Sequence, residues 1–427
     1  MIWSKSASSA PDDWVVRFTV GDDWRWDRHL LPYDLRGTEA HAWALAQVGV
    51  LTEGEHARIA EALEAIGQDA ESGAVTVNPE DEDCHTVIER ELTARLGELG
   101  KKIHAGRSRN DQVLVALRLW MRDGLGAVAA KVEQTAEALI GLAEANQAAV
   151  MPAYTHLQRA MPTTAGLWAA AYAELLLDDL DGLRYAREQA NTSPWGSAAG
   201  YGVPHLHFDR DGVADRLGFD RVQRHVPAVQ LSRGKMEGAV VHALVQAALT
   251  ANRLASDLVL FATGEFAFVK LPTAHTTGSS IMPQKRNPDV LELARATYHR
   301  LTSELHLLLT LPANLPGGYH RDLQLTKEAA MRSVMLSADL FSALAAGLPA
   351  LQFDRERMRA ALTPDLFATD EALRRTAAGT PFRDAYREVA AELDRIEVPA
   401  DPLAPYRTPG TPGHAGVAGL RERLNGL

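Results

Sequence analysis

Residues 240–261, VVHALVQAALTANRLASDLVLF, decide the fold class of this chain. Apolar side chains recur there in alternating steps of four and three residues, at Val240, Leu244, Ala247, Ala251, Leu254, Leu258 and Phe261. This spacing covers three heptads and predicts one buried stripe along a long, gently supercoiled helix. A helix with such a stripe needs partner helices, so the stretch predicts a helical bundle.

Four further stretches are rich in alanine and leucine, which favour helices. They cover residues 111–149, 166–191, 289–311 and 325–346. Short breaks containing Gly or Pro separate them, and no stretch gives a convincing set of alternating strands. We therefore expect an all-α chain with a central helical bundle domain at 106–353, an N-terminal domain at 1–105 and a C-terminal domain at 354–427.

The composition fits a soluble enzyme. The 427 residues suffice for more than one core, and 46% of them are apolar. The net charge of −11 gives no global electrostatic reason to bind nucleic acid, and the single Cys84 excludes an internal disulfide. Residues 1–13 lack the apolar stretch of a signal peptide, and the apolar run at 340–351 is too short to span a membrane. We therefore expect a cytoplasmic protein without membrane partners.

A polar loop follows the bundle seam at residues 278–288, GSSIMPQKRNP. Its glycine and prolines argue against an ordinary helix or strand. Ser279, Lys285 and Asn287 give the loop a hydroxyl, a cation and an amide instead of packing residues. Loops of this kind usually carry function. A solvated surface loop is the alternative interpretation.

A second polar segment, HAGRSRND at residues 104–111, precedes an apolar-periodic helix. A helix N-terminus presents unpaired N–H groups and partial positive charge, and an arginine fork matches a carboxylate. Arg109 and Asn110 are therefore candidate carboxylate ligands, although a capped helix start would also explain the segment.

Three more segments gather polar side chains, namely DEDCHT at 81–86, YTHLQRA at 154–160 and YHRDLQLTK at 319–327. A lone histidine such as His156 is more often structural than catalytic. Each of these segments, considered alone, is as compatible with a protein surface or a helix cap as with a site.

The five strings in this order resemble the fumarase/aspartase superfamily, whose members eliminate fumarate from a succinyl compound. The 278–288 loop resembles the flexible catalytic loop of that superfamily. Residues 104–111 resemble the H-T-G-R-S-R-N-D element of the argininosuccinate lyase family and differ from it only at Ala105. The other three strings resemble D-E-D-I-H-T, Y-T-H-L-Q-R-A and Y-N-K-D-L-Q-E-D-K of the same family.

The resemblance implies a fold, an activity and roles for individual residues. The implied fold is a fumarase/aspartase-like bundle of long helices with smaller terminal domains, in a homotetramer with a shared helical core and sites built from three chains. The implied reaction is the β-elimination of argininosuccinate to arginine and fumarate in arginine biosynthesis, with no metal or organic cofactor. The implied catalytic residues are Ser279 as the base, Lys285, His156 and its partner Glu292. The implied substrate-binding residues are Arg109, Asn110, Thr155, Asn287, Tyr319, Gln324 and Lys327.

Two departures from the family pattern concern the arginine half of the substrate. Asp23 stands where a substrate-binding serine is usual, and PAVQLSRGK at 227–235 replaces N-S-x-D-A-V-S-D-R-D. Two alternatives therefore stay open. One is a fumarate-releasing lyase acting on another N-succinyl amine. The other is a catalytically silent structural protein, which would be free to lose Ser279, His156 and Lys285.

Overall fold

The structure, a computed structural model, describes residues 12–426 and divides into two compact units. Unit 1 comprises Met1–Ala127, Leu183–Leu244 and Thr302–Met335, and unit 2 comprises Val128–Gly182, Val245–Leu301 and Leu336–Leu427. The expectation that residues 1–13 carry no signal peptide falls almost entirely on residues outside the described range.

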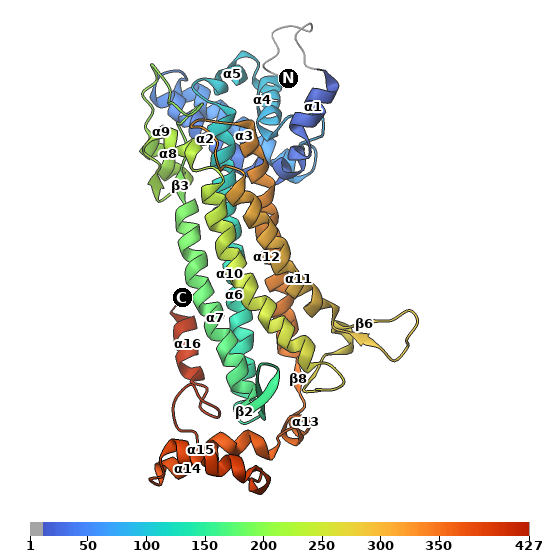
Figure 1. Ribbon diagram of the computed structural model, residues 1–427. Helices are drawn as coiled ribbons and strands as arrows, with labels where there is room; N and C mark the ends of the chain where they lie inside the picture. The colour runs from blue at the N-terminus through green and yellow to red at the C-terminus, as the bar shows by residue number, and fades with distance from the viewer. Residues whose placement is uncertain (1–11, 427) are drawn as a thin grey trace. The chain divides into compact units, whose positions relative to one another are not determined.

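Long helices dominate the described chain, as the sequence predicted (Figure 1). The five longest bundle helices are α6 (Arg109–Ala145), α7 (Ala165–Ala190), α10 (Lys235–Phe261), α11 (Asp289–Thr310) and α12 (Leu325–Gly347). Their bounds lie within a few residues of the predicted ones. Each of these helices contributes residues to both units.

The seam on α10 is buried along its whole length, from Val240 to Phe261. Because the apolar residues recur every three or four positions, they occupy one face of the helix and leave water together. The 4-3 spacing therefore marks a stripe in the interior of the chain's own bundle.

Unit 1 also contains shorter helices. They are α1 (Asp13–Val20), α2 (Asp23–Gln47), α3 (Glu53–Glu71), α4 (Cys84–Leu96), α5 (Glu98–Lys101), α8 (Arg210–Leu217) and α9 (Val226–Leu231). Side chains fix three of their starts: Thr52 and Glu55 form a capping box on α3, Asp83 caps α4 through the Thr86 backbone N–H, and Asp209 caps α8 through the Gly212 backbone N–H. Two short parallel strands, β3 (Thr192–Ser193) and β4 (Arg221–Val222), complete the unit.

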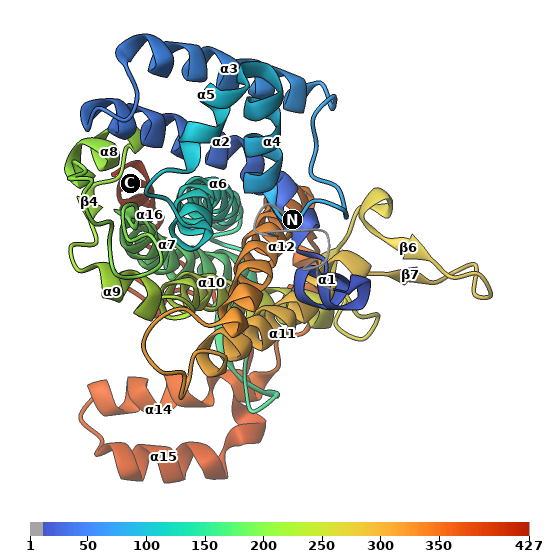
Figure 2. The same ribbon diagram turned by 90° about the horizontal axis from the view of Figure 1, so that it is seen from above.

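Unit 2 contains three antiparallel strand pairs that the sequence did not predict. They are β1 (Val150–Thr155) with β2 (Gln158–Thr164), β5 (Val269–Lys270) with β8 (Gln352–Phe353), and β6 (Thr277–Gly278) with β7 (Arg286–Asn287). The β6–β7 hairpin projects away from α11 (Figure 2). The unit ends in α13 (Arg355–Ala360), α14 (Ala368–Ala377), α15 (Phe382–Ala391) and α16 (Val417–Asn425).

By length and composition alone, the segment Arg321–Ala350 is apolar enough to cross a membrane. Core helices of soluble proteins meet the same criterion. Because α12 also buries Lys327, Ser333 and Ser337, we interpret this segment as a core helix.

Candidate active site

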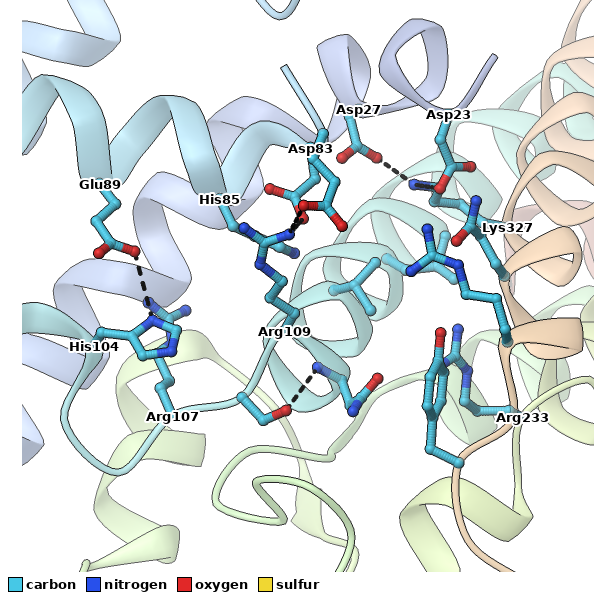
Figure 3. A pocket seen from close by; sticks show the side chains of 18 residues that line it. Asp23, Asp27, Asp83, His85, Glu89, His104, Arg107, Arg109, Arg233 and Lys327 are labelled. Carbon is cyan, nitrogen blue, oxygen red and sulfur yellow. Dashed lines mark hydrogen bonds and ion pairs between the residues drawn. The ribbon is translucent and has the colours of Figure 1, made fainter. Parts of the chain in front are cut away.

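A cavity of about 590 Å³ lies in unit 1, and charged side chains line most of it (Figure 3). The lining comes from α2, from α4 and the residues ahead of it, from α6 and the turn that leads into it, from Arg233 ahead of α10, and from the segment that runs into α12. The cavity brings together five of the predicted substrate-binding residues, Arg109, Asn110, Tyr319, Gln324 and Lys327. These five come from segments more than 200 residues apart in sequence.

The turn into α6 depends on a glycine. Gly106 has a φ of +70°, and a Cβ there would meet the Phe208 ring at 2.9 Å. Behind this turn the Asp111 carboxylate accepts the backbone N–H groups of Ser108 and Ala198 at 3.1 and 2.9 Å. Backbone bonds to a carboxylate satisfy otherwise unpaired donors at a helix start. The turn therefore holds Arg109 and Asn110 at the cavity wall.

Arg109 is already paired in this structure. Its Nη1 lies 2.5 Å from Glu82 Oε2 and 3.2 Å from Asp83 Oδ2, and its Nη2 donates to Thr86 Oγ1 at 3.0 Å. Burial opposes the charged form of Arg109, but the charges of Asp83 and Glu82 outweigh burial and raise its pKa. A substrate carboxylate would therefore compete with, or join, two protein carboxylates at this guanidinium.

Lys327 forms a second charged cluster, on the other side of the cavity (Figure 3). Its ammonium group is paired with Asp27 and lies 3.1 Å from Asp23 Oδ2. Burial opposes its charge, but Asp27 and Asp23 outweigh burial and raise the pKa of Lys327. Burial also raises the pKa of Asp23 to about 6, although Lys327 acts in the opposite direction. Asp23 thus titrates close to neutral pH.

Gln324 and Tyr319 lie beside this cluster. The Gln324 amide donates to the Thr19 carbonyl at 3.0 Å, as does Arg321 at 2.8 Å, so both side chains contact the end of α1. The Tyr319 ring lies under the Arg233 guanidinium, whose Cζ is 5.1 Å from the ring centroid. This contact is a cation–π interaction within the cavity wall.

Three potential metal ligands, Asp34, Cys84 and His85, are buried beside the cavity, which His85 also lines, with ligand atoms within 4.8 Å of one another. His85 Nδ1 lies 2.6 Å from Asp34 Oδ2, and the same carboxylate accepts from Gln112 and Arg107. Burial opposes the charged form of His85, but Asp34 and Asp83 outweigh it and raise its pKa. A carboxylate that already has a short imidazole bond and an arginine partner fits a hydrogen-bonded network better than a metal site.

The predicted catalytic loop lies in unit 2, between β6 and β7. Pairing of Thr277 with Asn287 and of Gly278 with Arg286 closes the loop at its base. Ser279 Oγ accepts two backbone N–H groups, from Met282 at 3.1 Å and from Ile281 at 3.4 Å. Both bonds are exposed and form a local turn at the start of the loop. Lys285 is exposed in the same loop, and Asn287 donates to Thr277 Oγ1 at 3.5 Å.

His156 occupies the two-residue turn of the β1–β2 hairpin, where Thr155 pairs with Gln158. The polar residues of this segment therefore belong to a hairpin and not to a helix cap, since α7 begins only at Ala165. His156 and Leu157 have φ angles of +54° and +57°, the left-handed values of a type I′ turn. Such values cost non-glycine residues free energy and are tolerated most often at functional positions.

The predicted pair of His156 and Glu292 does not form within one chain of this structure. Glu292, on the first turn of α11, lies 3.5 Å from Arg295. Within residues 12–426 neither the His156 ring nor the Thr155 hydroxyl has a hydrogen-bond partner, and both residues are exposed.

Sequence comparisons agree with the motifs. The family described as Lyase matches residues 16–302. An argininosuccinate lyase of Sorangium cellulosum (strain So ce56) is 46% identical over 430 residues, covering 99% of this chain and 98% of the relative. An argininosuccinate lyase of Thermotoga neapolitana is 41% identical, covering 92% of this chain and 98% of the relative. The chain belongs to the argininosuccinate lyase family.

Solved structures support the fold of this argininosuccinate lyase family member. The crystal structure of EDDS lyase in complex with formate has a TM-score of 0.79 at 24% identity and covers 96% of this chain and 90% of the other. A class II fumarase from Schistosoma mansoni has a TM-score of 0.72 at 15% identity, with 89% and 93% coverage. The expected helical fumarate lyase fold and the expected class of carbon–nitrogen lyase are confirmed.

Several residues that line the cavity of this family member were not predicted from the sequence. Asp27 could have been found, because it lies seven positions before Asp34 and fourteen before His41 on one face of α2, and all three are buried. Arg233 gave no comparable signal. It belongs to a segment that departs from the family pattern, and its place in the cavity depends on tertiary packing.

Proposed function

We propose that this chain cleaves argininosuccinate to arginine and fumarate in the cytoplasm, as a homotetramer whose sites combine residues of different subunits. Family membership supports the reaction. The observation that carries the site assignment is the pair of backbone N–H groups directed at Ser279 Oγ. We further propose that the domains follow the division at residues 105 and 353.

Elimination begins with removal of a proton from the carbon next to a succinyl carboxylate. A serine hydroxyl is a weak base in water, and a dry site with preorganised donors makes its alkoxide accessible. The N–H groups of Ile281 and Met282 supply such donors at Ser279. Lys285 and Asn287, in the same hairpin, hold the charge that builds up on the succinyl carboxylate as the proton leaves.

The C–N bond then breaks, fumarate forms, and the leaving guanidino nitrogen takes up a proton. We assign His156, polarised by Glu292, to this protonation or to orienting its donor. The hairpin turn presents His156 to solvent in an isolated chain, which favours a partner from another subunit. Contact between His156 and a subunit's cavity would also bring Thr155 to the substrate.

The cavity in unit 1 supplies the substrate-binding groups. We assign Arg109 and Asn110 to a succinyl carboxylate, because a guanidinium fork beside a helix start matches that anion. Tyr319, Gln324 and Lys327 hold the remainder of the substrate on the opposite wall. The cavity contains no serine base of its own other than Ser108, whose hydroxyl oxygen accepts the Asn110 N–H at 3.2 Å. The base must therefore come from outside the cavity lining, and we assign it to the Ser279 hairpin of another chain in the proposed tetramer.

A fumarate assay tests this function. We would incubate the purified enzyme separately with argininosuccinate, adenylosuccinate and aspartate and follow the absorbance of fumarate. We expect fumarate from argininosuccinate alone. Turnover of another N-succinyl amine in preference to argininosuccinate would contradict the assignment, and would fit the departures at Asp23 and residues 227–235.

A further inference from the structure

Arg233 is a buried cation whose partners are incomplete. Its side chain is in the wall of the unit 1 cavity, and the residue is only 5% exposed. Nη2 donates to the Leu323 carbonyl at 3.1 Å, whereas Nε and Nη1 have no hydrogen-bond partner among residues 12–426. Within the same range no carboxylate oxygen lies within 4.0 Å of this guanidinium.

Unpaired donors of this kind are costly, because a buried charged group loses its hydration without replacement. Arg107 is buried to a similar degree, but both of its Nη atoms have partners, Thr38 and Asp34, and only its Nε has none within the described range. Burial lowers the pKa of Arg233, and the nearby Glu237 and Tyr319 only partly offset this effect. The Tyr319 ring holds the guanidinium from one side. An anion entering the cavity would satisfy the two remaining donors.

The position of Arg233 indicates which anion this is. Figure 3 shows Arg233, Lys327 and Asp23 along one side of the cavity and Arg109 and Asp83 along the other. Under the proposed function, Arg109 takes a carboxylate of the succinyl half. On the Arg233 side, Lys327 is already paired with Asp27 and Asp23, so it is the less available cation for a second carboxylate.

The same side also contains a group suited to a cation. Within 4.0 Å the Asp23 carboxylate has one cationic partner among the described residues, Lys327. Its charge also acts on Arg233, where it raises the pKa. A free α-amino acid end carries a carboxylate and an ammonium group on one carbon. Arg233 and Asp23 offer the complementary pair of charges, and Asp23 is the residue at which this chain departs from the usual serine.

We propose that Arg233 binds the α-carboxylate of the arginine half of argininosuccinate, with Asp23 beside it receiving the α-ammonium group. This inference rests on the proposed function. It makes Arg233 a substrate-binding residue that distinguishes the arginine half from the fumarate half.

Product binding tests the inference separately from turnover. We would measure the inhibition constants of L-arginine and of fumarate, and the affinity for L-arginine by calorimetry, for the wild type, Arg233→Gln and Arg233→Lys. Losing hydrogen bonds to a charged group predicts a weakening of about tenfold or more for arginine in Arg233→Gln. The inhibition constant of fumarate should change by less than about twofold, since that product occupies the Arg109 side. Arg233→Lys keeps the charge but loses the fork, so it should weaken arginine binding by an intermediate amount.

Arg210→Gln is the matched control. Arg210 is half-buried, lies outside this cavity, and donates to the Trp195 and Gln223 carbonyls, each at 2.8 Å. Its loss should lower the melting temperature without changing arginine affinity in the folded fraction. Unchanged arginine affinity in both Arg233 variants, or an equal loss for fumarate, would overturn the inference even if wild-type turnover is normal. A wild type that binds arginine but makes no fumarate from argininosuccinate would instead contradict the proposed function.

Discussion

Ser279 is the residue on which the proposed chemistry depends most directly. Its replacement by alanine removes the proton acceptor and leaves the cavity of unit 1 intact. We expect kcat of Ser279→Ala to fall by about 10²- to 10⁴-fold, the range for loss of a general base, while calorimetry still detects substrate binding. Ser280→Ala, one residue away, should change kcat only a few-fold. Retention of more than about a tenth of wild-type kcat in Ser279→Ala would show that another group is the base.

The raised pKa of Asp23 predicts how the stability of the folded protein changes with pH. Its pKa is about 6 in the folded protein and 3.8 in the unfolded reference, so folding favours its protonated form. The stability that this group contributes is therefore complete below about pH 3.8 and is lost as the pH rises through about 6. At pH 8 the Asp23 carboxylate is ionised although it is largely buried, which opposes folding. The neutral side chain of Asp23→Asn carries no such charge.

The measurement is chemical denaturation of Asp23→Asn and wild type at pH 5 and pH 8. One pKa unit lies between pH 5 and the folded pKa, so the advantage of the variant should grow by about 1.4 kcal/mol between these two pH values. Asp22→Asn, an exposed neighbour paired with Arg25, serves as the control and should show no such growth. An advantage of Asp23→Asn that is equal at both pH values would contradict the raised pKa.

At the level of single elements, the start of α7 lies close to the backbone of residues 143–147, and Gly166 makes this close approach possible. A Cβ at Gly166 would lie 2.7 Å from Gln147 Cα and 2.8 Å from the Ala143 carbonyl oxygen, which are backbone atoms that cannot rotate away. We expect Gly166→Ala to lower the free energy of unfolding by about 1–3 kcal/mol. Gly182→Ala in the same helix meets nothing within 4 Å and should be neutral or stabilising by up to about 1 kcal/mol. Equal melting temperatures for the two variants would show that the chain ahead of α7 adjusts.

The elements also show what sequence alone could predict. The predicted bounds of the bundle helices agree with the observed ones within a few residues. The 3.6-residue period of apolar side chains is a local property of each segment, as at Val240 to Phe261, so it can be recognised from the sequence. The β1–β2 hairpin was not predicted, because Pro152 and the polar run at 154–159 interrupt any alternation of apolar and polar residues. Its strands form through mutual pairing, which a single segment does not encode.

The same distinction holds for the candidate site. Family strings indicated Arg109, Asn110, Tyr319, Gln324 and Lys327, and the fold brings these residues to one cavity. Their actual partners were not predictable, since Lys327 pairs with Asp27 across 300 residues of sequence. Such pairings depend on how α12 and α2 pack within unit 1, and pKa shifts like that of Asp23 follow from the packing.

At the scale of the whole molecule, the α10 seam cannot serve as the subunit interface, as its residues are already buried within one chain. Other apolar side chains remain exposed on the long helices, including Leu249 on α10 and Leu293 and Leu309 on α11. Exposed large apolar residues on bundle helices are suited to contact a second copy of the chain. We expect the interface of the proposed tetramer to include them.

Subunit mixing tests this assembly and the shared site together. If Ser279 and Arg109 reach one site from different chains, then Ser279→Ala and Arg109→Ala subunits should restore activity after dissociation and reassembly. The activity should elute at the volume of a tetramer. A mixture of Ser279→Ala with Lys285→Ala is the control, since both residues belong to one hairpin loop and no site could regain the pair. Proven subunit exchange without recovered activity in the first mixture would place Ser279 and Arg109 in the same chain's site.

The turn at His156 and Leu157 has a consequence for how this protein could evolve. Asparagine and glycine suit both left-handed positions, so the present pair sacrifices local stability, and Leu157 does so with a side chain that is 78% exposed. Laboratory selection for heat resistance alone should therefore replace both residues. A second selection would require heat resistance in cells that depend on this enzyme for their arginine. It should replace Leu157, for instance by glycine, and keep His156. Retention of His156 in the second lineage only would support its proposed role in the reaction.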